Sequence, residues 1–253
     1  MIQGCWKNLP SEIRLQILME TDLVRRTTPM KAWMDDDKIE IEHGKLVPST
    51  CACYSVPTAI FQVSKLFNCE ATEIFFSKNI FMFRGDLLAT TQFLAGLPNP
   101  AVQNLRIIEL HLDFDQIYFG LSTPGSRISR EWHDLISLLR ERLLLSKLWL
   151  SILAIDPDTQ FKFVTLNNDG DHDYQWLHTA SFQLLKPLDQ LKGLRKFHVS
   201  LCWSTDFEAV VEKAVMGPEY DSLAEGKPSY KFFLGLNSVL RMPMAESLAI
   251  STS

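Results

Sequence analysis

The sequence predicts an α/β fold, with α+β as the alternative, in which N-terminal helices precede a mostly parallel, irregular sheet with covering helices. Three short segments share the pattern apolar-x-x-apolar-x-apolar, and each follows a segment with helical spacing of its apolar residues. Strands that alternate with helices need crossover connections, which place the strands parallel to one another. With 46% hydrophobic and 22% charged residues over 253 positions, the chain can bury a substantial core.

The first predicted element is a helix over 10–24, within the stretch LPSEIRLQILMETDLV. Proline suits its first turn, because the N–H that proline lacks has no partner there. Its apolar residues lie on two sides of the helix: Leu9, Ile13, Ile17 and Leu18 on one, Leu15 and Met19 on the other. A helix with this much apolar surface is covered from two directions. Either its own domain wraps it, or one stripe docks on its own chain and the other on a second protein.

Residues 25–57 mix proline, glycine and charge, which is typical of a long loop or a small hairpin. The hairpin would pair Lys38–Glu42 with Lys45–Val47 and turn at His43-Gly44. Helical spacing returns over 58–79, where one face carries Ile60, Val63, Phe67, Ala71, Ile74 and Phe75. A buried strand is expected over 79–83.

The repeated pattern begins at Leu105, Leu145 and Leu194. The preceding helices are expected at 87–97, 129–145 and 175–191. Its copies are spaced more widely than standard leucine-rich repeats, so the sheet is either a degenerate relative of that architecture or an ordinary α/β sheet. Further elements are expected at 161–166 (an antiparallel strand), 206–215 and 230–240 (helices).

Aligned copies of this pattern predict two rows of side chains that leave the core and run across neighbouring strands. The fifth position gives Glu109, Trp149 and His198, and the seventh gives His111, Ser151 and Ser200. Aromatic anchors beside charged groups suit a bound peptide, so these six residues are the predicted substrate-binding surface. The alternative is that helices cover both faces of the sheet and leave these residues partly buried.

The chain resembles the fungal F-box-like proteins. Four stretches carry the resemblance: LPSEIRLQILMETDLV, CACYSVPTAIFQVSKLFNCEATEIFFSKNIFMF, LRIIELHL and LKGLRKFHVSL. The resemblance implies an F-box-like helical segment over 1–78, with a long loop at 25–57, and an α/β leucine-rich-like recognition domain over 79–253. It also implies a substrate receptor of an SCF-type ubiquitin ligase, which binds a Skp-type adaptor and an unknown protein target. The matching adaptor-facing positions are Leu9, Pro10, Ile13, Ile17, Leu18, Val63, Leu66 and Phe67.

The loop at 25–57 departs from the more compact F-box pattern, so the alternative is an interaction scaffold that has lost adaptor binding. A formal charge of −5 without a basic block argues against nucleic-acid and anionic-membrane partners. Five cysteines and the absence of a secretory signal are typical of a reduced, cytoplasmic or nuclear protein. We expect a monomer outside its complex.

Sites for covalent chemistry, metals or cofactors are not expected. Cys51, Cys53, Cys69 and His43 lack the spacing of a zinc site, and Cys69 is expected to be a small core residue. The acidic stretch 167–174 lacks the first and last ligands of a calcium-binding loop. No nucleophile elbow or phosphate loop occurs, so the predicted function is not enzymatic. A less favoured alternative is an enzyme or small-ligand site near His111, Asp113 and His198.

Overall fold

The computed structural model describes residues 6–21, 23–24, 38–42, 44–46, 61–112, 120–121, 123–154, 183–184, 186–200 and 205–225. Within these ranges the chain forms a six-stranded sheet with the order β2-β1-β3-β4-β5-β6. The strands are β1 (Lys38–Glu42), β2 (Lys45–Leu46), β3 (Ile80–Arg84), β4 (Ile107–Leu112), β5 (Trp149–Ala154) and β6 (Lys196–Ser200). All neighbouring pairs are parallel except β1 and β2, which form the predicted antiparallel hairpin. The predicted α/β class is confirmed.

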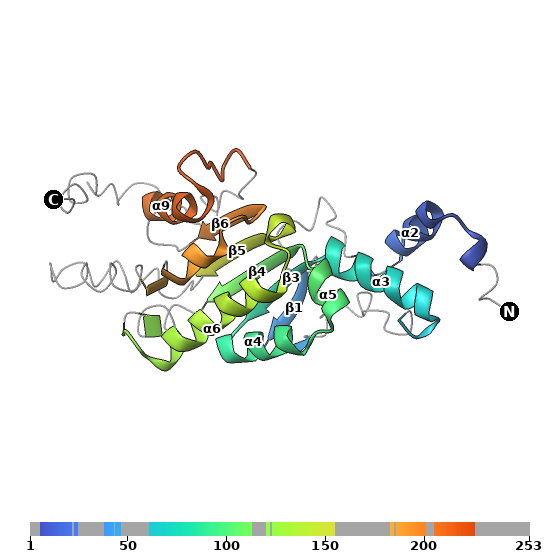
Figure 1. The fold of residues 1–253 in the computed structure, drawn as a ribbon, viewed down its shortest axis with the longest axis horizontal. Coiled ribbons are helices and arrows are strands. Elements are labelled where there is room, and N and C mark those ends of the chain that lie inside the picture. The colour runs from blue at the N-terminus through green and yellow to red at the C-terminus, as the bar shows by residue number, and fades with distance from the viewer. Residues whose placement is uncertain are drawn as a thin grey trace, which may run out of the picture.

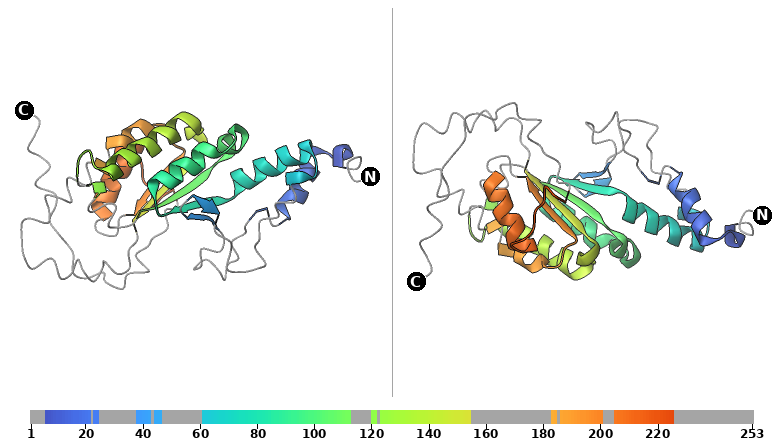
Figure 2. Two further views of the ribbon diagram at one scale, coloured as in Figure 1. Left: turned by 90° about the horizontal axis from the view of Figure 1, so that it is seen from below. Right: turned by 90° about the horizontal axis from the view of Figure 1, so that it is seen from above.

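Helices cover one face of this sheet, and a helical extension leaves one end of it (Figure 1). The helices are α2 (Ser11–Met19), α3 (Lys65–Lys78), α4 (Leu87–Gly96), α5 (Asn99–Asn104), α6 (Arg127–Arg142) and α9 (Thr205–Met216), with 3-10 turns at Leu145–Lys147 and Asp189–Leu191. Figure 2 shows α4, α6 and α9 on the same side of the strands. The extension consists of α2 and α3, with α3 leading directly into β3.

Two predicted helices are shorter in the structure than the periodicity indicates. The first ends at Met19 rather than at residue 24, where Thr21 Oγ1 donates a 2.6 Å hydrogen bond to the carbonyl of Leu18. The second begins at Lys65 rather than at residue 58, because the Ser64 hydroxyl accepts from the backbone N–H of Phe67. Such capping bonds satisfy backbone groups that have no partner within the helix. The elements predicted at 161–166, 230–240 and over most of 175–191 lie outside the described residues.

The main core lies between the helices and the strand face that carries Phe81, Ile108, Leu150 and Phe197. Trp132 of α6 is fully buried there, and its Nε1 donates to the carbonyl of Leu184 over 3.1 Å. Burying a large apolar side chain stabilises a fold by about 1.5–3 kcal/mol, so the strand residues on this face contribute substantially to the stability. Because both faces of these strands are largely buried, a parallel sheet is the expected arrangement.

Arg142 ties the end of α6 to the end of α4. Its guanidinium donates to the carbonyls of Leu94, Ala95 and Leu97 and to the side chain of Asn99, at distances from 2.6 to 3.0 Å. The last carbonyls of a helix lack intrahelical partners, and a cation also complements the negative end of the helix dipole. This single side chain therefore caps α4 and fixes its position against α6.

Candidate functional site

The helical extension is held together by polar contacts centred on Glu70 of α3. Arg14 of α2 donates to both oxygens of this carboxylate, from Nη2 to Oε1 over 2.6 Å and from Nε to Oε1 over 2.9 Å and to Oε2 over 3.1 Å. Trp6 Nε1 also donates to Oε2 over 3.1 Å. The hydrogen bond to Glu70 raises the pKa of the Arg14 guanidinium, against the opposing effect of burial. Bidentate contacts of this kind fix orientation as well as distance, so α2 has a defined rotation against α3.

A second set of contacts fixes the C-terminal end of α2. Leu18 and Leu23 are fully buried in the core. Asn79, between α3 and β3, donates from Nδ2 to the carbonyl of Leu23 over 2.7 Å and to that of Phe75 over 2.8 Å. The amide thus links the N-terminal segment to the start of the sheet, and α2 is fixed at both ends.

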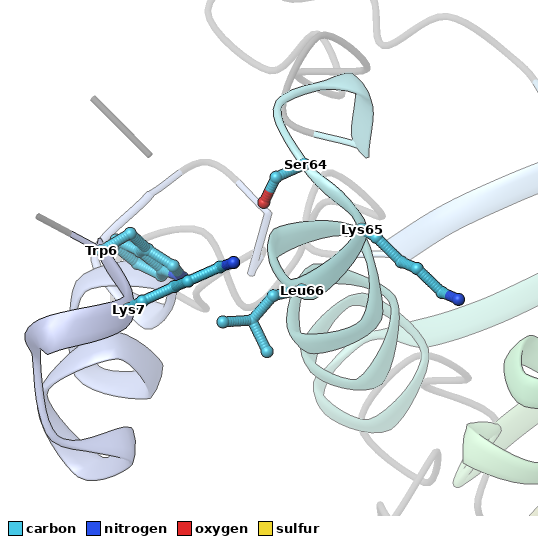
Figure 3. A pocket seen from close by; sticks show the side chains of 5 residues that line it. All are labelled: Trp6, Lys7, Ser64, Lys65 and Leu66. Carbon is cyan, nitrogen blue, oxygen red and sulfur yellow. The ribbon is translucent and has the colours of Figure 1, made fainter. Parts of the chain in front are cut away.

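Large apolar side chains nevertheless remain exposed on this extension. Ile13 and Ile17 are each 42% exposed, Met19 is 38% exposed, and Val63, just before α3, is 46% exposed. Ile13 and Ile17, one helical turn apart, line a shallow depression of about 310 Å³ together with Gln16 and Glu20. A second depression of about 250 Å³ lies between Trp6, Lys7, Ser64, Lys65 and Leu66, where the first helical turns meet α3 (Figure 3).

The predicted adaptor-facing residues divide into three groups. Pro10, Ile13, Ile17 and Val63 are exposed, while Leu9 and Leu66 are half-buried. Leu18 is fully buried, so its prediction as a surface residue is wrong, because this side of α2 packs against its own chain. The ring of Phe67 lies 4.3 Å from that of Trp6 and packs against the core, so it supports the extension from within.

The six predicted substrate-binding residues lie on one face of the sheet, opposite the main core, but not in the predicted rows. Glu109 is opposite Ser151, and Ser151 is opposite His198. A second row consists of Ile107, Trp149 and Lys196. A third row consists of His111, Leu153 and Ser200. The predicted rows are wrong because the first residues of the second copy of the pattern, Leu145–Lys147, form a 3-10 turn. Strand β5 therefore starts later, and its residues are shifted by two positions relative to β4 and β6. A shift of two keeps every side chain on its face.

These residues do not form an open surface. Glu109, Ser151, His198 and Ser200 are buried, and His111 and Trp149 are half-buried. The prediction of exposed peptide anchors is therefore wrong for the four buried residues. All six are buried or half-buried, as the alternative expected, although the described helices lie on one face of the sheet and not on both. Their polar groups contact one another: His111 Nε2 lies 2.5 Å from Glu109 Oε1. The rings of Trp149 and His198 meet edge-to-face at 5.2 Å, and Lys196 Nζ lies 5.5 Å from the centre of the Trp149 ring.

This arrangement does not match a nucleophilic triad. In the row Glu109–Ser151–His198 the hydroxyl stands between the carboxylate and the imidazole, whereas a triad needs the imidazole in the middle. His111 and His198 are separated by the whole of β5, which places their strands about 10 Å apart. Asp113 lies outside the described residues.

Metal ligands do not cluster in the part of the chain that the structure describes, where no group of three or more His, Cys, Asp or Glu residues could hold a metal ion. Cys69 is exposed on α3, so the expectation of a core cysteine is wrong. Its helix turns Ala71 and Ile74 toward the core instead. His43, Cys51, Cys53 and the acidic stretch 167–174 lie outside the described residues.

No family model matches the chain, and no curated protein or solved structure matches it either. Among the described helices, none has the length and apolar character to cross a membrane.

Sequence reasoning missed the residues that orient the exposed surface, namely Trp6, Arg14, Glu70 and Asn79. A signal was present for two of them: Arg14 and Glu70 carry opposite charges on two helices that both have an apolar side to bury. Asn79 and Trp6 gave no such signal, because their partners are backbone and side-chain groups far away in the sequence.

Proposed function

We propose that this protein is a protein-interaction subunit, and that the exposed side of α2 is a docking surface for a Skp-type adaptor of an SCF-type ubiquitin ligase. The observation that carries the proposal is the exposure of Ile13 and Ile17 on a helix whose other side is fixed by Arg14 and Leu18. In this role the α/β domain would hold the target protein, and the partner enzymes would supply the covalent chemistry.

The physical argument rests on the combination of a rigid backbone and uncovered apolar side chains. An exposed apolar patch is unfavourable in water, and grouped patches mark interaction sites. Helices that dock in a groove present apolar residues at i and i+4, which is the spacing of Ile13 and Ile17. Because α2 is anchored by Glu70 and Asn79, its exposed side is held ready for a partner and loses little entropy on binding.

The structure narrows the surface that the resemblance to F-box-like proteins implies. The direct contacts of the proposed surface are Pro10, Ile13, Ile17 and Val63, with Leu9 and Leu66 at its margin. Leu18 and Phe67 support it from inside the extension. Met19, exposed on another side of α2, is not part of this surface.

The test is co-expression of the full chain with a Skp-type adaptor, followed by purification through a tag on the adaptor. The parent chain should co-purify, and Ile13→Asp should weaken the complex about tenfold or more, because a carboxylate would be buried against apolar groups. Val210→Asp is the matched control, since Val210 is 50% exposed on the distant helix α9. If the parent chain does not co-purify, the adaptor proposal is wrong and a scaffold without adaptor binding becomes the better explanation.

A further inference from the structure

The outer strand β6 is covered along its backbone edge by side chains. β6 is the last strand in the sheet order, so one of its edges has no neighbouring strand among the described residues. Along a strand, alternate residues direct their N–H and C=O groups toward the same edge. In β6 these residues are Phe197 and Val199, and unpaired groups at such an edge readily pair with another strand.

Two side chains occupy these backbone groups in place of a strand. The Tyr220 hydroxyl accepts from the N–H of Phe197 over 3.1 Å and donates to its carbonyl over 3.0 Å. Glu212 of α9 accepts from the N–H of Val199 over 2.8 Å. The second oxygen of Glu212 accepts from the Ser222 hydroxyl over 2.5 Å. We call Glu212 together with residues 217–225 the edge clasp.

The edge clasp is itself held in place. Gly217, at φ +111°, ends α9 and turns the chain back toward β6, a conformation that other residues rarely adopt. The carboxylate of Asp221 accepts from the N–H groups of Leu223 and Ala224. Lys196 Nζ lies 3.1 Å from the Glu225 carboxylate. Burial raises the pKa of the Tyr220 phenol, whose hydroxyl is in any case protonated at neutral pH and able to donate.

We propose that the edge clasp keeps β6 from pairing with β6 of a second copy of this chain. Two identical edges can pair antiparallel about a two-fold axis, because each supplies the same set of groups to the other. With Phe197 of one copy opposite Val199 of the other, the exposed groups would satisfy one another across the new ladder. The clasp occupies the N–H and C=O of Phe197 and the N–H of Val199 within one chain, so the intact protein remains a monomer. This inference is independent of the proposed adaptor binding.

The test compares the parent chain with the double variant Tyr220→Phe/Glu212→Ala by sedimentation velocity and amide hydrogen exchange. The parent should sediment as a monomer of 29.0 kDa at all concentrations. In the double variant the Phe197 and Val199 amides should exchange about tenfold faster at low concentration, and should regain protection as a dimer forms at high concentration. Leu223→Ser, in the same segment but strongly exposed, is the matched control and should behave as the parent.

A monomeric double variant would overturn the proposal, whether or not the two amides exchange faster. A parent chain that dimerises with concentration-dependent protection of the same amides would also overturn it. If circular dichroism shows that the double variant is unfolded, Tyr220→Phe alone carries the test. This variant removes only one hydroxyl, and the same rise in Phe197 exchange and weaker dimerisation are expected from it.

Discussion

Helix α2 and strand β6 lie at different ends of the molecule (Figure 1) and differ in how far their outward groups are covered by the chain itself. On β6, Tyr220 and Glu212 hydrogen-bond the N–H and C=O of Phe197 and the N–H of Val199, which face away from β5. On α2, Ile13 and Ile17 stay exposed although Arg14 and Leu18 fix the same helix to its own chain. The chain therefore covers the outer edge of β6 with its own side chains and leaves the apolar side of α2 exposed. The exposed side of α2 is the surface that we propose for a partner.

The largest expected effect lies in the core that supports both regions. Trp132→Ala should lower the free energy of unfolding by about 3–5 kcal/mol, because it leaves a cavity and removes the hydrogen bond to Leu184. Denaturant titration monitored by far-ultraviolet circular dichroism measures the change, because this signal reports the backbone and not the mutated tryptophan. Leu88→Ala, at an exposed position of α4, should change it by no more than about 0.5 kcal/mol. An equal loss in both variants would contradict this view of the core.

The next effect concerns the polar capping of α4. Arg142→Ala should destabilise the fold by roughly 1.5–3 kcal/mol, because the carbonyls at the end of α4 lose a charged donor. Arg140→Ala is the control, since Arg140 is exposed and its contact with Gln190 is long, at 3.4 Å. Thermal unfolding of the two variants separates them. The account of α4 is wrong if Arg142→Ala unfolds at the temperature of the control.

A smaller effect concerns the orientation of α2 on α3, which can change without a loss of stability in the sheet. Glu70→Ala removes the acceptor that both Arg14 and Trp6 use, so α2 should lose its fixed rotation on α3. Amide exchange in α2 should accelerate, and adaptor affinity should fall severalfold, while the sheet amides keep their protection. Glu73→Ala, at an exposed position of the same helix, is the matched control. Unchanged exchange in α2 would show that Glu70 does not position this helix.

The smallest effect concerns Glu131 of α6. Burial raises the pKa of this carboxyl, and only part of that effect is offset by Arg127. Ionisation of Glu131 is therefore less favourable in the folded state than in the unfolded state. The protonated carboxyl favours folding, and this contribution to stability is lost as pH rises above the ordinary carboxyl range. Glu131→Gln should raise the melting temperature slightly at pH 7 and leave it unchanged near pH 4. A lower melting temperature at pH 7 would show that the ion pair with Arg127 outweighs burial.

Much of the fold follows from local sequence patterns. The turn predicted from the His43-Gly44 sequence located the β1–β2 hairpin, and the three repeated patterns located β4, β5 and β6. Their register did not follow, because the 3-10 turn before β5 depends on packing and leaves the pattern of apolar residues unchanged. Burial was harder still: Ile17 and Leu18 are neighbours of similar hydrophobicity, yet one is exposed and one is fully buried. The rotation that separates them depends on contacts distant in the sequence, among them the bidentate Arg14–Glu70 contact.

The most direct measurement is calorimetric titration of a purified Skp-type adaptor into the parent chain and into Ile17→Asp. We expect the parent to bind and Ile17→Asp to bind about tenfold more weakly, with the free energy of unfolding changed by no more than about 0.5 kcal/mol. Equal affinity of the two chains, or a parent that does not bind, would contradict the claim that the uncovered side of α2 is an interface.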